Sequence, residues 1–141
     1  MSTVAPIEPA SADARVAAVF DDIRTTRGSD FINNFWRYLA ADPALLVATW
    51  AEVKHVMAAP GALDPFTREL IYVAVSVANG CGYCVHSHTA AARARGMSAA
   101  QHAELLAIVG LAAKTNHLAT ALQVPVDAAF EHPPAVAAGP Q

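Results

Sequence analysis

Apolar residues recur at helical spacing along most of this chain. In the first such segment they follow the i, i+3, i+4, i+7 pattern that puts side chains on one face of an α-helix: Val16, Val19, Phe20 and Ile23. Ser11 or Asp13 can cap the start of this helix, and Gly28 is placed to end it. No segment has the regular alternation of a β-strand. The pattern therefore predicts an all-α fold.

Further helices begin at capping signals, above all at two Asp-Pro pairs and at the Ser98-Ala-Ala-Gln101 capping box. We expect helices after Asp30, from Asp42-Pro43 to Pro60-Gly61, from Asp64-Pro65 to about Asn79, from Cys81 to Gly96, from Ser98 onward, and around Lys114–Leu122. The helix after Asp30 should have one apolar side made of Phe31, Ile32, Phe35, Trp36 and Leu39. The helix that ends near Asn79 is apolar nearly all round, which predicts a place at the centre of the fold.

Proline and glycine content sets the expected domain organisation. Residues 1–10 should form a flexible N-terminal arm, and residues 125–141 a flexible C-terminal tail. Between them, residues 11–124 should form a single helical domain of about six to seven helices, a size that is sufficient for a core of its own.

Composition adds an expectation about assembly. The apolar fraction is 55% and the charged fraction only 15%, which predicts apolar surface buried between subunits of a homo-oligomer. The net charge of -3 and the lack of a basic stripe argue against nucleic-acid binding. The chain starts without a secretory signal, and its longest apolar run, Leu70–Ala78, is too short to cross a bilayer. We expect a cytoplasmic protein without a membrane partner.

The candidate chemistry lies between Glu69 and His88, a stretch that contains both cysteines of the chain. If Cys81 and Cys84 start a helix, they share a face with His88, four residues further on. A helix N-terminus and a nearby base both favour the reactive thiolate over the thiol. In a reducing compartment such a close pair is typically redox-active, catalytic or metal-binding.

Several simpler interpretations stay open for these residues. The cysteines could be small buried apolar groups, and Cys81, Cys84 and His88 could supply three zinc ligands, although a second ligand pair is missing. Glu69 in a first helical turn also complements the helix dipole. Tyr83 could simply pack, and His86 lies off the stripe of the cysteines, so both are secondary candidates.

The spacing of these residues resembles the active-site pattern of the carboxymuconolactone decarboxylase family, in its alkylhydroperoxidase D-like branch. Eleven residues separate Glu69 from the Cys81-x-x-Cys84 pair, and three residues separate Cys84 from His88. The resemblance covers about residues 40–122. The best-characterised members have histidine at the position of Tyr83. Tyrosine at this position is similar to the peroxidase-related members. The resemblance implies an alkylhydroperoxidase D-like helical domain that assembles into trimers or larger rings such as hexamers.

The resemblance also implies an antioxidant, thiol-dependent peroxidase. Cys84 would attack a hydroperoxide, and Cys81 would resolve the sulfenic acid to a disulfide. Glu69 and His88 would form a proton relay. The reductant would be an external dithiol, either lipoyl or thioredoxin-like, and no haem, flavin or metal cofactor would be needed.

Three other functions remain as alternatives. The same cysteines could serve a general disulfide oxidoreductase or a redox sensor with little peroxide turnover. The family also contains lactone decarboxylases, but these do not rely on a Cys-x-x-Cys pair. A zinc-binding or oligomeric scaffold without enzymatic activity is the last alternative.

Overall fold

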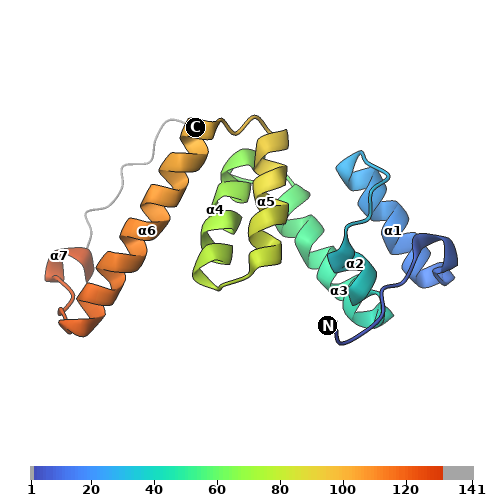
Figure 1. Ribbon diagram of the computed structural model, residues 1–141, viewed down its shortest axis with the longest axis horizontal. Coiled ribbons are helices and arrows are strands. Elements are labelled where there is room, and N and C mark those ends of the chain that lie inside the picture. Colours follow the sequence, from blue (N-terminus) through green and yellow to red (C-terminus); the bar gives the residue numbers. More distant parts are fainter. Residues whose placement is uncertain (1, 132–141) are drawn as a thin grey trace. The chain divides into compact units, whose positions relative to one another are not determined.

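The computed structural model describes residues 2–131, and every regular element among these residues is helical (Figure 1). The helices are α1 (Ala14–Arg27), α2 (Asn34–Leu39), α3 (Pro43–Val53), α4 (Pro65–Ala78), α5 (Gly82–Ala94), α6 (Ala99–Ala121) and α7 (Ala128–Glu131). Two short turns accompany them, a 3₁₀ turn at Pro9–Ser11 and a π-helical turn, η2, at Lys54–Ala58. The all-α prediction is confirmed.

Local capping explains most of the helix boundaries. The Asp13 carboxylate accepts a hydrogen bond from the Val16 amide at the start of α1, and Gly28 ends that helix in the left-handed conformation. Asp42 caps α3 in the same way. At α6 the Ser98–Gln101 capping box is complete, with both reciprocal hydrogen bonds present.

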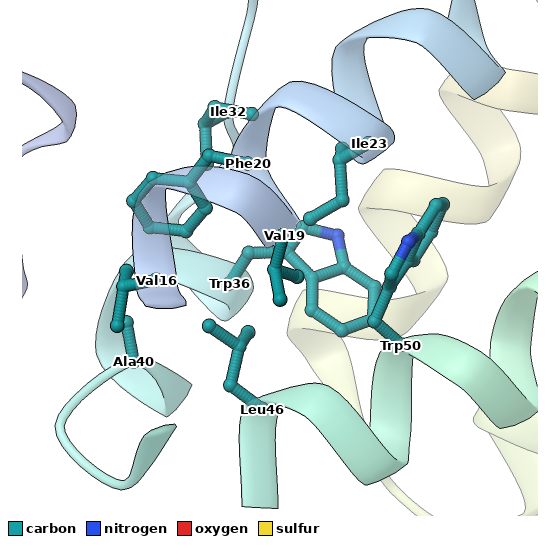
Figure 2. Close-up of a cluster of buried hydrophobic side chains, with 9 residues drawn as sticks. All are labelled: Val16, Val19, Phe20, Ile23, Ile32, Trp36, Ala40, Leu46 and Trp50. Atoms are coloured by element: carbon teal, nitrogen blue, oxygen red, sulfur yellow. The ribbon is translucent and has the colours of Figure 1, made fainter. Parts of the chain in front are cut away.

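The chain divides after Arg68 into two compact units. The first contains a core built by α1, α2, α3 and the segment before α2 (Figure 2). Its buried side chains are Val16, Val19, Phe20, Ile23, Ile32, Trp36, Ala40, Leu46 and Trp50. The two tryptophans meet edge to face, with ring centroids 5.3 Å apart, a favoured aromatic geometry. The apolar stripe predicted for α1 is therefore buried.

Three predicted details are wrong. The second helix begins at Asn34 instead of just after Asp30, and Phe31 and Phe35 are exposed. The reason lies in the preceding turn, where Arg24 of α1 holds the Asp30 carbonyl. The sixth and seventh expected helices are one continuous helix, α6. Gly110 weakens a helix by about 1 kcal/mol but does not end it, because the alanine and leucine residues around it favour helix.

The third correction concerns α4. Only Glu69, Val73 and Ser76 of this helix are buried, while Ile71 and Val75 are about half exposed. The described chain therefore does not cover α4 on all sides. The second unit also contains α6, which has no buried residue.

Other expectations remain open. The division into arm, domain and tail stays a prediction, and residues 132–141 of the expected tail lie outside the described residues. Within the described part of that tail, α7 forms a single short helical turn. Across residues 2–131, no helix has the length and hydropathy needed to cross a membrane.

Asp22 joins α1 to α3 by a hydrogen bond and to the start of η2 by an ion pair. The Trp50 indole Nε1 donates to its Oδ2 at 2.6 Å, and Lys54 Nζ lies 2.7 and 2.9 Å from its two oxygens. The bonds from Lys54 and then from Trp50 lower the pKa of Asp22 below its usual range. A carboxyl group with a lowered pKa stabilises the folded state above its unfolded pKa, and this contribution is lost as the pH falls through the folded pKa.

We predict that Asp22→Ala lowers the free energy of unfolding by on the order of 1 kcal/mol at pH 7, because the part-buried Trp50 N–H loses its acceptor. Chemical denaturation of both proteins from pH 7 to pH 2 measures the effect. The difference should be constant above about pH 4 and shrink at lower pH. A difference that grows as the pH falls would contradict this account.

Candidate active site

A tight turn brings the end of α4 back to the start of α5. Gly80 has φ 68°, a left-handed conformation that residues with a Cβ adopt only at a cost. Its amide donates to the Val77 carbonyl, and the Cys81 amide donates to the Ser76 carbonyl at 2.9 Å, which satisfies the end of α4. Cys81 is consequently placed directly before α5, as its N-cap residue.

The two cysteines occupy the first turn of α5. Cys81 is the N-cap residue, and its sulfur accepts a hydrogen bond from the Cys84 amide at 3.3 Å. In the structure the two sulfurs form a disulfide, with the Cα atoms 5.3 Å apart. Both residues are half-buried, so they remain partly open to solvent. The amide at the helix start would favour a thiolate on Cys81 after reduction.

Buried Glu69 on α4 pairs with partly buried His88 on α5. Glu69 is 6% exposed, and its Oε2 lies 2.7 Å from His88 Nδ1. A carboxylate can only accept, so the hydrogen bond has Nδ1–H as its donor, and Nε2 is the ring nitrogen that Glu69 does not engage. His88 is also one helical turn after Cys84. The arrangement can therefore move a proton at the side of α5 on which Cys84 lies.

Two further residues support this pair, and sequence reasoning did not select either of them. Arg95 Nε lies 3.7 Å from Glu69 Oε1, so the second carboxylate oxygen faces a cation. The Tyr72 ring stacks on His88, with centroids 3.7 Å apart and planes inclined by 18°. Spacing could have indicated both: Arg95 follows His88 by two helical turns, and Tyr72 follows Glu69 by three residues.

The secondary candidates, Tyr83 and His86, are more exposed than Glu69 and His88. Tyr83 is 44% exposed between the two cysteines. His86 is exposed, and its side chain makes no hydrogen bond or ion pair with the described part of the chain. The structure thus brings Glu69 and His88 together and keeps His86 apart from them. Among residues 2–131, no three histidine, cysteine or acidic side chains gather as a metal-binding group.

Comparison with known proteins identifies the family. The model of the carboxymuconolactone decarboxylase family matches residues 44–127, which is more than half of the chain and includes the whole Glu69–His88 stretch. This chain belongs to that family. The family predicted from the motif is confirmed, whereas the roles of the individual residues stay predictions.

Within the carboxymuconolactone decarboxylase family, the similar proteins are named for alkylhydroperoxidase D. A crystal structure of the alkylhydroperoxidase AhpD core from Rhodospirillum rubrum is 66% identical, with a TM-score of 0.91 over 94% of this chain and 98% of that chain. Alkyl hydroperoxide reductase AhpD of Solibacter usitatus is 35% identical over 65% of this chain and 50% of its own length. AhpD of Maricaulis maris is 40% identical over 48% of this chain and 37% of its own length. The chain therefore spans half or less of the length of these two curated relatives.

The geometry predicts different reactivities for the two reduced thiols. The helix start favours Cys81, whereas the His88 base, one turn away, favours Cys84. We expect Cys84 to react faster, because a base both generates the thiolate and holds the proton nearby. In Cys81→Ser, Glu69→Gln should slow the alkylation of Cys84 at pH 7 by about tenfold.

Iodoacetamide alkylation followed by mass spectrometry, on Cys81→Ser and Cys84→Ser separately, measures both rates. Glu104→Gln on α6 is the matched control, since it removes an exposed carboxylate from another helix. The assignment fails if Cys81 in Cys84→Ser is the faster thiol, or if Glu104→Gln slows Cys84 as much as Glu69→Gln.

Proposed function

We propose that this protein is a thiol-dependent peroxidase that reduces alkyl hydroperoxides through Cys84 and Cys81. The observation that carries the proposal is the disulfide at the start of α5, beside the Glu69–His88 pair. A dithiol that closes to a disulfide can deliver the two electrons that cleavage of an O–O bond requires. The similarity to proteins named alkyl hydroperoxide reductase AhpD supports the same reaction.

In the first step, His88 takes the proton of the Cys84 thiol, and the thiolate attacks the terminal, hydrogen-bearing oxygen of the hydroperoxide. A sulfur–oxygen bond forms, the O–O bond breaks, and Cys84 becomes a sulfenic acid. The leaving alkoxide takes a proton from His88 and departs as an alcohol. Glu69 holds Nδ1 of the ring, so that the positive charge on imidazolium is balanced while His88 carries the second proton.

In the second step, Cys81 attacks the Cys84 sulfur and releases the oxygen as water. The Cα separation of 5.3 Å permits the resulting bond. The N-cap position of Cys81 suits this role, because the Cys84 amide stabilises negative charge on its sulfur. An external dithiol, lipoyl or thioredoxin-like, then reduces the disulfide and is itself oxidised, which completes the cycle.

We predict sustained consumption of cumene hydroperoxide by the reduced protein when dihydrolipoamide is supplied. Cys84→Ser should abolish it, and Cys81→Ser should allow one turnover that leaves a sulfenic acid. His88→Ala should reduce the rate by about a hundredfold, the usual range for loss of a general acid–base group, and His117→Ala on α6 serves as control.

Peroxide consumption and the mass of each cysteine state provide the measurements. Turnover in Cys84→Ser would exclude the mechanism. A wild-type protein that exchanges disulfides with dithiols but does not consume peroxide would instead be a general disulfide oxidoreductase or redox sensor.

We also propose that the chain forms a homo-oligomer through α6. No residue of this helix is buried. Leu106 is exposed on another side, but four exposed apolar side chains recur at steps of three, seven and four residues along one side of α6 and its C-cap: Ile108, Leu111, Leu118 and Leu122. Such a stripe is stable in water when a second apolar surface covers it. In a solution of the pure protein, a second copy of this chain is the partner that can cover the stripe.

We predict that Leu111→Glu combined with Leu118→Glu shifts the oligomer to monomer at micromolar concentration, because two charges would be buried without partners. Ala113→Glu, on the opposite side of α6 by helical periodicity, should leave the mass unchanged. Light scattering after size-exclusion chromatography measures the mass. A monomeric wild-type protein would contradict the proposal.

A further inference from the structure

Tyr72 lies against the face of the His88 ring. The ring centroids are 3.7 Å apart, and the planes are inclined by only 18°. Because Tyr72 follows Glu69 by three residues on α4, one side of one helix supplies both the carboxylate at the edge of the imidazole and the phenol on its face. Tyr72 is 37% exposed, so burial in the core does not account for its place.

A single hydrogen bond cannot fix the imidazole completely. The Nδ1–Oε2 contact of 2.7 Å holds one atom of the ring, but coupled changes of the two His88 side-chain torsions can still produce a rotation of the ring plane while this contact is kept. The His88 side chain is 23% exposed, which leaves room for such a rotation. A flat group stacked on the ring restricts this rotation, because turning the imidazole would break the face-to-face contact.

We propose that Tyr72 is a positioning residue for the proton relay. Its ring fixes the plane of His88, so that Nδ1 stays on Glu69 and Nε2 is presented to Cys84. This inference rests on the proposed function, since it assigns Tyr72 to the same relay. The phenol ring does the positioning, and the hydroxyl group takes no part in it.

The test compares Tyr72→Leu with Tyr72→Phe, both in a Cys81→Ser background so that Cys84 stays reduced. Tyr72→Leu should slow alkylation of Cys84 by about three- to tenfold, the range that corresponds to one aromatic contact. Tyr72→Phe keeps a flat ring and should keep the parent rate. Ile71→Ala is the matched control, because it removes the neighbouring exposed side chain of α4.

Nitrogen NMR of His88 supplies a second measurement that does not depend on peroxide turnover. The parent and Tyr72→Phe proteins should show one dominant tautomer with the proton on Nδ1, while Tyr72→Leu should show a mixture of tautomers. Parent-like rate and tautomer in Tyr72→Leu would overturn the inference. A slowed alkylation and a mixture of tautomers in Tyr72→Phe would also overturn it, because the hydroxyl group would then be responsible.

The two proposals can fail separately. If Glu69→Gln slows Cys84 and Tyr72→Leu does not, the relay stands and Tyr72 has no positioning role. If Glu69→Gln also leaves the rate unchanged, the proposed function loses its relay, and the NMR signature alone decides the role of Tyr72. Should Tyr72→Leu unfold, as judged by circular dichroism, Tyr72→Met tests the same loss of a flat ring.

Discussion

The hydrogen bond between Glu69 and His88 is the constraint on which the rest of the site depends. A carboxylate that is only 6% exposed is costly to bury unless charged or hydrogen-bonded partners surround it. His88 of α5 and Arg95, the C-cap residue of α5, supply these partners, one for each oxygen. The pairing therefore ties α5 to α4 in one register, and the Gly80 turn makes that register possible.

This register separates two chemical environments within one turn of α5. Cys81 lies at the N-cap, where a backbone amide faces its sulfur, while Cys84 lies one turn before the base. After reduction, we expect the two thiols to differ in what favours their thiolates: the helix start in the case of Cys81 and a proton acceptor in the case of Cys84. In the proposed mechanism, this difference, more than the Cys-x-x-Cys spacing itself, would assign the attacking and resolving roles.

Local signals predicted much of the fold. Asp13, Asp42 and Ser98 each carry a capping interaction that depends on neighbouring residues alone, so the helix starts were readable from the sequence. The start of α2 could not be predicted in this way, because it depends on a contact between Arg24 and the Asp30 carbonyl. The continuity of α6 through Gly110 was missed for a different reason, since glycine weakens a helix without necessarily ending it.

In the candidate site, too, some residues could be predicted from the sequence and others could not. The motif selected Glu69, the two cysteines and His88, and the structure pairs Glu69 with His88 and joins the two cysteines. Tyr72 and Arg95 were missed because their importance follows from the orientation of a ring and the second oxygen of a carboxylate, which no residue pattern specifies. Spacing placed them on suitable helix faces, but only the structure showed what they contact.

A double-mutant cycle on Glu69 and His88 tests the central claim most directly. The measured quantity is the single-turnover rate of hydroperoxide reduction by the reduced protein, for Glu69→Gln, His88→Asn and the double variant. If the two residues act as one relay, the double variant should be no slower than the slower single variant. Losses that multiply in the double variant would show that the two residues act independently and would contradict the account.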